Sequence, residues 1–356
     1  MPLIIEGGRV PTRWAETRHP RPAASKDSHA MRDCISLALI NNMPDAALED
    51  TELQFFELLD IASGDVPVVI KLYSLAGVPR TDRGQRHLNS FYWDFNDLWN
   101  ARFDGVIVTG TEPREPDLRD EPYWGPLANV FDWAEQNTSS TVLSCLAAHA
   151  SVLHCDGISR KRLPDKQFGV FESMKTCDHP LLNGVSSSVR FPHSRWNEVR
   201  ENELSAAGYL VLTKSATAGV DLFAKKKKKS LFVHFQGHPE YSAQTLAKEY
   251  RRDIKRFLRG ERETYPSMPH GYFGASSARL LESYRENALR DRREEMIESF
   301  PESVVSGLEN EWKSSSVCVY RNWLTYLMSQ RVESTTFATF VRVGRETTRP
   351  VNNEVA

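Results

Sequence analysis

The sequence lacks several features that would indicate a membrane, secreted or metal-binding protein. Its 356 residues contain no apolar run close to the roughly 18 residues that cross a bilayer, and no apolar region near the N-terminus that is typical of a signal peptide. Its five cysteines are odd in number and have neither regular spacing nor a C-x-x-C pair, which argues against a disulfide framework and a structural zinc site. We therefore expect a cytoplasmic protein with no membrane contact and no bound metal.

The chain also lacks an excess of one charge. Its 45 basic residues are balanced by 47 acidic ones, for a formal net charge of −2, so nothing in the overall charge favours nucleic acid or anionic lipid. The run Lys225–Lys229 is a local exception. We interpret it as a solvated hairpin turn because it lies between two strand-like segments, and a phosphate or nucleic-acid patch is the alternative. Small-molecule partners are expected, and no nucleic acid.

Strand-like apolar runs alternate with amphipathic segments over the first part of the chain. The apolar runs are typical of buried strands, and the segments between them are long enough to be crossover helices. The expected strands are 35–40, 66–73, 103–110 and 141–144, and the expected helices are 48–59, 92–101 and 124–136. This alternation predicts an α/β fold with a doubly wound, mostly parallel sheet flanked by helices.

Three parts of the chain differ in pattern. An irregular N-terminal arm covers 1–31, one α/β domain covers 32–260, and a loop and helical C-terminal extension that packs on the core covers 261–356. Later elements are expected as strands at 189–195, 208–213 and 231–235, and as helices at 242–258 and 276–297, with an apolar segment at 317–330.

A single cysteine ends one of the expected strands. Thr141-Val-Leu-Ser-Cys-Leu-Ala-Ala-His149 passes from a β-branched apolar run to small residues that suit a helix. Cys145 is therefore expected at a strand-to-helix junction on the carboxyl edge of the sheet, where open α/β sheets bind ligands. A helix N-terminus favours the thiolate form, so Cys145 is a candidate nucleophile. A buried structural cysteine is the alternative.

A second expected strand ends at Gln236-Gly-His-Pro-Glu240. His238 is a candidate general base, and Glu240 is the nearest carboxylate that can orient its ring. The proline between them restricts the backbone. Two histidines on the helix after the cysteine, His149 and His154, are weaker candidates for the base.

The cysteine junction and the His-Pro-Glu pair resemble the class I glutamine amidotransferase-like fold. Within that superfamily the chain resembles the homoserine O-acyltransferases of methionine biosynthesis, which include homoserine O-succinyltransferase and acetyl-transferring relatives, over about 37–257. The matching strings are Asn42-Met-Pro44, His87-Leu-Asn-Ser-Phe-Tyr92, Phe103-Asp-Gly-Val-Ile-Val-Thr-Gly110, Tyr123-Trp124, Pro192-His-Ser-Arg195 and Gly237-His-Pro-Glu-Tyr241, with a weaker match at Asn322-Trp-Leu-Thr-Tyr326. A plain glutamine amidotransferase would share the cysteine and His-Pro-Glu but not Pro-His-Ser-Arg.

The resemblance implies acyl transfer by a ping-pong mechanism. Cys145 would attack an acyl-CoA thioester, and a homoserine hydroxyl deprotonated by His238 would then take the acyl group. Succinyl-CoA or acetyl-CoA would be a co-substrate, no cofactor would stay bound, and the protein would form a homodimer. Glu240 would orient the histidine.

Further residues are implied for the amino-acid acceptor. Ser194 and Arg252 match family positions that hold it, and an arginine suits its α-carboxylate as a bidentate partner. The sequence leaves open whether Arg251 or Arg252 faces the pocket, because one residue rotates a helical side chain by about 100°. Arg195 is interpreted as a member of a structural ion pair.

The chain departs from the family pattern at two places. Family members carry a lysine soon after Met-Pro, near the oxyanion, whereas this chain continues as Asp45-Ala-Ala-Leu-Glu49. Either backbone amides suffice as oxyanion donors here, or the chemistry has changed. After Gly110, family members carry a small or acidic residue that selects the acyl donor, and Arg114 stands at or near this position. Arg114 pairs either with the free carboxylate of a succinyl-like donor or with Glu112 or Asp117.

Three functions are therefore compared. The main hypothesis is a CoA-dependent O-acyltransferase that transfers a succinyl or acetyl group to homoserine or a similar amino acid. The alternative is a glutaminase or other cysteine hydrolase of the same fold, which would release ammonia from glutamine and would not need Ser194 or Arg252. A non-catalytic protein is the third, and the complete set of Cys145, His238 and Glu240 argues against it.

Overall fold

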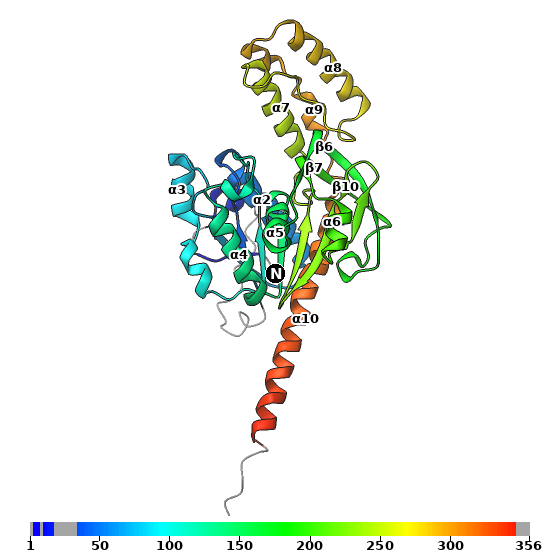
Figure 1. Cartoon of the computed structure of the whole chain (residues 1–356). Coiled ribbons are helices and arrows are strands. Elements are labelled where there is room, and N and C mark those ends of the chain that lie inside the picture. The colour runs from blue at the N-terminus through cyan, green and yellow to red at the C-terminus, as the bar shows by residue number, and fades with distance from the viewer. Residues whose placement is uncertain (1–2, 8–9, 18–33, 347–356) are drawn as a thin grey trace, which may run out of the picture.

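The computed structural model describes residues 3–7, 10–17 and 34–346, with side chains described through residue 332. An eight-stranded central sheet has the strand order β1-β3-β2-β4-β5-β12-β11-β8 (Figure 1). Its strands are β1 (Ile4–Ile5), β2 (Ile35–Ile40), β3 (Val68–Tyr73), β4 (Gly105–Val108), β5 (Ser140–Ser144), β8 (Leu210–Val211), β11 (Leu222–Lys227) and β12 (Ser230–Phe235). All pairs are parallel except those that β11 makes with β12 and β8. The predicted doubly wound, mostly parallel sheet is confirmed.

Helices cover both faces of this sheet, because successive side chains of a strand point to opposite faces. Leu37 and Leu39 of β2 pack in the same cluster as α2 and α10, whereas Ala38 and Ile40 pack in the cluster of α4 and α5. The helices are α1 (Thr12–Thr17), α2 (Asp45–Ser63), α3 (Asp82–Phe91), α4 (Trp124–Asn137), α5 (Leu146–Asp156), α6 (Glu201–Ala206), α7 (Thr245–Leu258), α8 (Ala275–Arg290), α9 (Ser303–Ser306) and α10 (Lys313–Glu346). In the described part of the chain, none of them has an apolar stretch that could cross a membrane.

A second, four-stranded sheet was not foreseen in the sequence. Its order is β10-β9-β6-β7, with β6 (Lys161–Lys175), β7 (Ser188–Glu198), β9 (Thr213–Ser215) and β10 (Gly219–Val220). The register of the β6–β7 pair shifts between Arg162 and Gln167. The many charged residues at the start of β6 hide the alternation of a strand, and this explains why the pattern did not reveal it.

Part of the predicted N-terminal arm belongs to the core. Ile4–Ile5 pairs in parallel with β3, and Trp14 of α1 packs edge-on against Phe56 of α2, with ring centroids 5.5 Å apart. Residues 18–31 of the arm lie outside the described residues. At the other end of the chain, Trp323 of α10 donates a hydrogen bond from Nε1 to Ser140 Oγ (2.9 Å), so this helix is seated against β5. The division into three parts stays a prediction.

Two local predictions need correction. The helix expected at 92–101 is wrong, because the α-helix of this crossover is α3 and the residues Phe95–Asn100 form a 3₁₀ helix. The lysine run is only partly a turn, since Lys225–Lys227 belong to β11 and Lys228, with φ 45°, makes the turn. Figure 1 shows α7, α8 and α9 gathered at one end of the molecule and α10 projecting from the opposite end.

Candidate functional site

Cys145 lies at the junction between β5 and α5. Its backbone has φ 52° and ψ −107°, a strained conformation for a residue other than glycine. The Cys145 amide donates to the carbonyl of Phe235 in β12 (2.7 Å), and its carbonyl accepts from the amide of His149 (3.2 Å). A sharp strand-to-helix turn of this kind exposes a nucleophile at the edge of the sheet. It also places the thiol at the N-terminus of α5, which favours a negative charge there.

The backbone after β4 packs against this turn. A Cβ atom on Gly110 would lie 3.1 Å from the amide nitrogen of Leu146 and 3.4 Å from the carbonyl oxygen of Ser144, so a side chain would disturb the turn. The first amides of α5 have no carbonyl partner within the helix. They can therefore donate to an oxyanion that forms at the thiol.

His238 and Glu240 form a buried pair beside Cys145. The Nδ1–H of His238 donates to Oε1 of Glu240 (2.8 Å), and the same ring makes a hydrogen bond with Cys145. Burial disfavours the charged ring, but the negative charges of Glu240 and Cys145 raise the pKa of His238 well above its usual value. The three side chains thus form one hydrogen-bonded series that can hold a thiolate and an imidazolium together.

Backbone hydrogen bonds fix the position of His238. Its amide donates to the carbonyl of Pro192 (2.7 Å), and the amide of Gly237 donates to Oδ1 of Asp221 (2.9 Å). A Cβ atom on Gly237 would lie 2.9 Å from both Asp221 Oδ1 and His193 Nε2. Glycine is needed because these two buried side chains pack directly behind the loop.

The other two histidines considered as the base, His149 and His154, have side-chain partners other than Cys145. The Nε2–H of His149 donates to Oε1 of Gln236 (2.9 Å), and burial lowers the pKa of His149 to about 3. His154 pairs with Asp132 at the surface (2.9 Å). Of these three histidines, His238 is the one that makes a hydrogen bond with the thiol.

Ser194 and Arg252 converge on one carboxylate, that of Glu249. Ser194 Oγ donates to Glu249 Oε2, and Arg252 Nη2 lies 3.8 Å from the same oxygen. Tyr241 donates from its hydroxyl to Glu249 Oε1 (2.7 Å), and its ring stacks on His238 with centroids 4.2 Å apart. The two acceptor residues implied by the resemblance therefore lie next to the catalytic candidates.

The geometry also answers which arginine faces the site. Arg252 donates from Nε to Asp253 Oδ1 (3.0 Å), on the same side of α7 as Glu249. Arg251 pairs with Glu302 instead (2.7 Å).

Lys166 is a site residue that the sequence analysis missed. Its ammonium lies 3.0 Å from Asp253 Oδ2 and 3.6 Å from Glu249 Oε2, and it sits over the ring of Phe168 at 4.0 Å. Lys166 falls within the charged start of β6, where nothing distinguished it from its neighbours. One signal was present, because Glu249 and Asp253 are four residues apart and so share a helix face.

The side chain of Arg114 is exposed, and the two acidic residues that were expected to pair with it pair with other arginines instead. Asp117 pairs with Arg119 (2.6 Å), and Glu112 pairs with Arg256 (3.4 Å). Within the described residues, the guanidinium of Arg114 makes no ion pair or hydrogen bond.

Arg195 lies in a structural environment, but it forms no ion pair with any of the described residues. It is buried and donates to His193 Nδ1 (3.2 Å) and to the carbonyls of Asn197 (2.8 Å) and Ala218 (2.5 Å).

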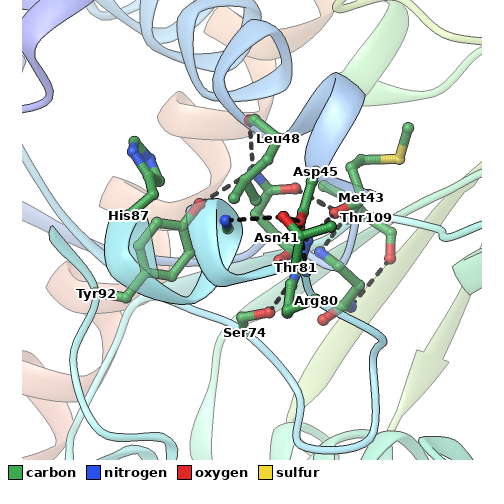
Figure 2. Close-up of polar contacts among 12 residues, drawn as sticks. Asn41, Met43, Asp45, Leu48, Ser74, Arg80, Thr81, His87, Tyr92 and Thr109 are labelled. Atoms are coloured by element: carbon green, nitrogen blue, oxygen red, sulfur yellow. Dashed lines mark hydrogen bonds and ion pairs between the residues drawn. The ribbon is translucent and has the colours of Figure 1, made fainter. Parts of the chain in front are cut away.

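A buried polar network holds the loop that follows β2 (Figure 2). The side chain of Arg80, only 6% exposed, donates to the carbonyl of Met43 and pairs with Asp45 (3.2 Å). In the same loop the amide of Asn42 donates to Thr109 Oγ1 (2.8 Å), and its side-chain nitrogen donates to the Thr109 carbonyl (3.2 Å). The network thus connects Arg80 to the residue that precedes Gly110.

The other side of this network reaches two helices. Asn41 Nδ2 donates to the hydroxyl of Tyr92 (3.1 Å), which in turn donates to the buried carboxylate of Glu52 (2.6 Å). His87 Nε2 lies 2.7 Å from the same Glu52 oxygen. Burial opposes a charge on His87, but the hydrogen bond that His87 donates to Glu52 and the negative charge of Glu52 raise the pKa of His87. In the described ranges, no group of three or more His, Cys, Asp or Glu side chains is arranged to hold a metal ion.

Comparison with known proteins gives a consistent result. The family model described as homoserine O-succinyltransferase matches residues 20–334. A homoserine O-succinyltransferase of Rhodopseudomonas palustris is 44% identical over 307 residues, which are 86% of this chain and 92% of the relative. One of Bradyrhizobium japonicum is 41% identical over 330 residues, or 92% of this chain and 99% of the relative.

Among solved structures, two glutamine amidotransferases are similar. The protein from Methylobacillus flagellatus has a TM-score of 0.46 and 12% identity, over 83% of this chain and 95% of that chain. The protein from Thermotoga maritima has a TM-score of 0.45 and 10% identity, over 83% of this chain and 98% of that chain.

Proposed function

Because this chain belongs to the homoserine O-succinyltransferase family, we propose that it transfers a succinyl group from succinyl-CoA to the hydroxyl of homoserine. It is an acyltransferase, and the family name places the reaction in methionine biosynthesis. The family assignment favours this function over the glutaminase alternative. The observation that carries the proposal is the hydrogen-bonded series of Cys145, His238 and Glu240 with Ser194 and Arg252 beside it.

The first half of the reaction forms a thioester on Cys145. The thiolate attacks the thioester carbonyl of the donor, and the resulting oxyanion is stabilised by backbone amides at the start of α5. The C–S bond to CoA then breaks, and the imidazolium of His238 gives its proton to the leaving thiolate. Cys145 is left acylated and His238 is left neutral.

The second half discharges this thioester to the acceptor. Neutral His238 takes the proton of the homoserine hydroxyl, whose oxygen attacks the acyl carbonyl, and the Cys145 thiolate leaves. Glu240 holds the Nδ1–H tautomer and stabilises the imidazolium that forms. This returns the starting thiolate and imidazolium pair.

The acceptor needs partners for an α-carboxylate and an α-ammonium group. Arg252, with Lys166 close by, supplies cations for the carboxylate, and Ser194 supplies a hydroxyl. Glu249 is the carboxylate that contacts all three side chains, and we assign it to the ammonium group. When homoserine binds in this arrangement, its contacts replace those that these side chains make with one another in the ligand-free protein.

The direct test is the mass of the intact protein after brief incubation with succinyl-CoA, acetyl-CoA or glutamine. We expect the wild-type protein to gain one succinyl group and to lose it when homoserine is added, because the acyl-enzyme is an intermediate. Cys145→Ser should gain none, since a serine hydroxyl is a much weaker nucleophile at neutral pH. Ammonia and glutamate from glutamine, with no adduct from either CoA ester, would contradict the proposal.

We assign the selection of succinyl-CoA over acetyl-CoA as acyl donor to Arg114. Its free guanidinium can pair with the terminal carboxylate of a succinyl group, which an acetyl group lacks. We expect Arg114→Ala to lower kcat/KM for succinyl-CoA by about tenfold and to leave the value for acetyl-CoA unchanged. Arg119→Ala is the matched control, because Arg119 lies in the short 3₁₀ helix that follows this loop but is paired with Asp117. An equal loss with both donors would show that Arg114 does not read the carboxylate.

A cytoplasmic location and a homodimer are the expected setting of this enzyme, and both stay proposals. Light scattering at several protein concentrations would give the oligomeric state.

A further inference from the structure

A cavity of about 380 Å³ lies beside the ion pair of Lys166 and Asp253. Four segments line it: Pro164–Lys166 with Phe168 of β6, Trp196 of β7, Asp253 of α7, and Arg262 with residues 264–267 of the loop after α7. Cavities of roughly 300 to 1,000 Å³ hold ligands of drug size, so this one is larger than an amino acid such as homoserine requires.

The local fold builds this cavity. The register shift between Arg162 and Gln167 takes Pro164–Lys166 out of the β6–β7 ladder, and such bulges turn side chains away from the sheet. The opposite wall, formed by the loop after α7, is attached to the same strand. The amide of His270 donates to the Phe168 carbonyl of β6 (2.9 Å), and the His270 carbonyl accepts from the Val170 amide (2.8 Å). Both walls are therefore positioned by β6.

The lining has the chemistry of a site for a phosphorylated nucleoside. Trp196 and Tyr265 offer aromatic rings for stacking with a base, and the guanidinium of Arg162 lies 4.4 Å from the ring of Trp196. Lys166 and Arg262 add cations on the cavity wall. Thr264 and Ser267 line the same wall with hydroxyl groups.

The charges around the cavity leave cations for a ligand. Arg262 Nη1 lies 4.0 Å from Asp253 Oδ2, an oxygen that Lys166 already contacts at 3.0 Å. Among the described residues, Lys166, Arg252 and Arg262 make their ion pairs with two carboxylates, those of Glu249 and Asp253. Asp165 also lines the cavity and is exposed, whereas Arg162 adds a cation at its rim.

The cavity lies beside the reaction centre and is separate from it. Contacts lead from Lys166 to Glu249 (3.6 Å), from Glu249 to Tyr241 (2.7 Å), and from the Tyr241 ring to the ring of His238 (4.2 Å). A donor that fits this arrangement has its reacting carbonyl at one end of a long arm and its largest, charged part at the other. Acyl-CoA has this shape.

We propose that the cavity between β6, Trp196 and the 262–267 loop binds the phosphorylated adenosine end of the acyl-CoA donor. This inference rests on the proposed function, which supplies the donor. Arg262 then contacts phosphate, and Trp196 or Tyr265 stacks on the adenine ring.

The test compares two donors that carry the same acyl thioester. Succinyl-CoA carries the nucleotide, whereas succinyl-S-N-acetylcysteamine keeps only the thioester end of the donor and lacks the nucleotide. For Trp196→Ala and Arg262→Gln, we expect the concentration of succinyl-CoA that half-saturates acylation of Cys145 to rise about tenfold. The value for the short donor should stay unchanged. Adenosine 3′,5′-bisphosphate should compete with succinyl-CoA in the wild-type protein but not with the short donor.

Arg259→Gln is the matched control, because Arg259 follows directly on α7 but pairs with Glu294 outside the cavity. It should leave both donors unaffected. The inference would be overturned if the two donors changed equally, if neither changed, or if only the KM of homoserine changed. It would also be overturned if the bisphosphate did not compete with succinyl-CoA in the wild-type protein. Failure of both donors to acylate wild-type Cys145 would instead contradict the proposed function.

Discussion

The Glu240→Gln variant is expected to lose about 10³- to 10⁴-fold in kcat. The carboxylate accepts the Nδ1–H of His238 and balances the positive charge that the ring acquires during the reaction. Glutamine has nearly the same shape but no negative charge, and its amide N–H₂ can face Nδ1 and stabilise the other tautomer. The ring would then present an N–H to the thiol where a base is needed.

Single-turnover acylation with succinyl-CoA, followed by discharge with homoserine, measures this loss in each half-reaction. Ser144→Ala is the matched control, because Ser144 Oγ also donates to Glu240 Oε1 (3.3 Å) without touching the histidine. It should stay within a few-fold of the wild-type rate. A Glu240→Gln enzyme that retained a tenth of the wild-type rate would show that Glu240 does not orient the base.

The second large effect is expected for Arg80→Met, at about 10²-fold in the rate of acylation. Arg80 holds the carbonyl of Met43 and the carboxylate of Asp45 in the loop after β2 (Figure 2). That loop is bonded through Asn42 to Thr109, and the next residue, Gly110, packs against the Cys145 turn. Loss of the guanidinium should let this wall of the oxyanion site move.

Arg83→Met is a close control for that experiment. Arg83 of α3 makes an ion pair with Glu49 of α2 (2.8 Å), but it lies at the surface and does not touch the loop. Removing a buried cation also destabilises a protein, so the rates are compared at a temperature where circular dichroism shows all variants folded. Equal acylation rates in the two variants would show that the loop does not depend on Arg80.

Much of the fold could be predicted because it depends on local patterns. Buried parallel strands are continuous apolar runs, and β2, β5 and β12 were recognised from such runs with bounds close to those of the structure. β6 could not be recognised in this way, because its first residues are charged and its pairing is interrupted by a bulge. The same lack of an apolar pattern hid α3, which is strongly polar.

The candidate site likewise contains residues that local patterns could predict and residues that they could not. Cys145, His238 and Glu240 each stand at or just after the end of a recognisable strand, so their sequence positions already indicated a common edge of the sheet. Lys166, Glu249 and Arg80 come from a bulged strand, a helix face and a loop. They take part in contacts between residues far apart in the chain, such as Arg80 with Asp45, 35 positions apart, and Lys166 with Glu249, 83 positions apart.

Local sequence was enough to predict the alternation of strands and helices, the strand-to-helix junction at Cys145 and the histidine–carboxylate pair, because each follows from residues that are neighbours in the chain. The tertiary structure was needed to show that Arg252 and not Arg251 faces Glu249, that the Arg114 guanidinium has no partner among the described residues, and that a cavity lies beside Lys166. These depend on how distant segments pack, and side-chain direction and free volume are properties of that packing rather than of any local pattern.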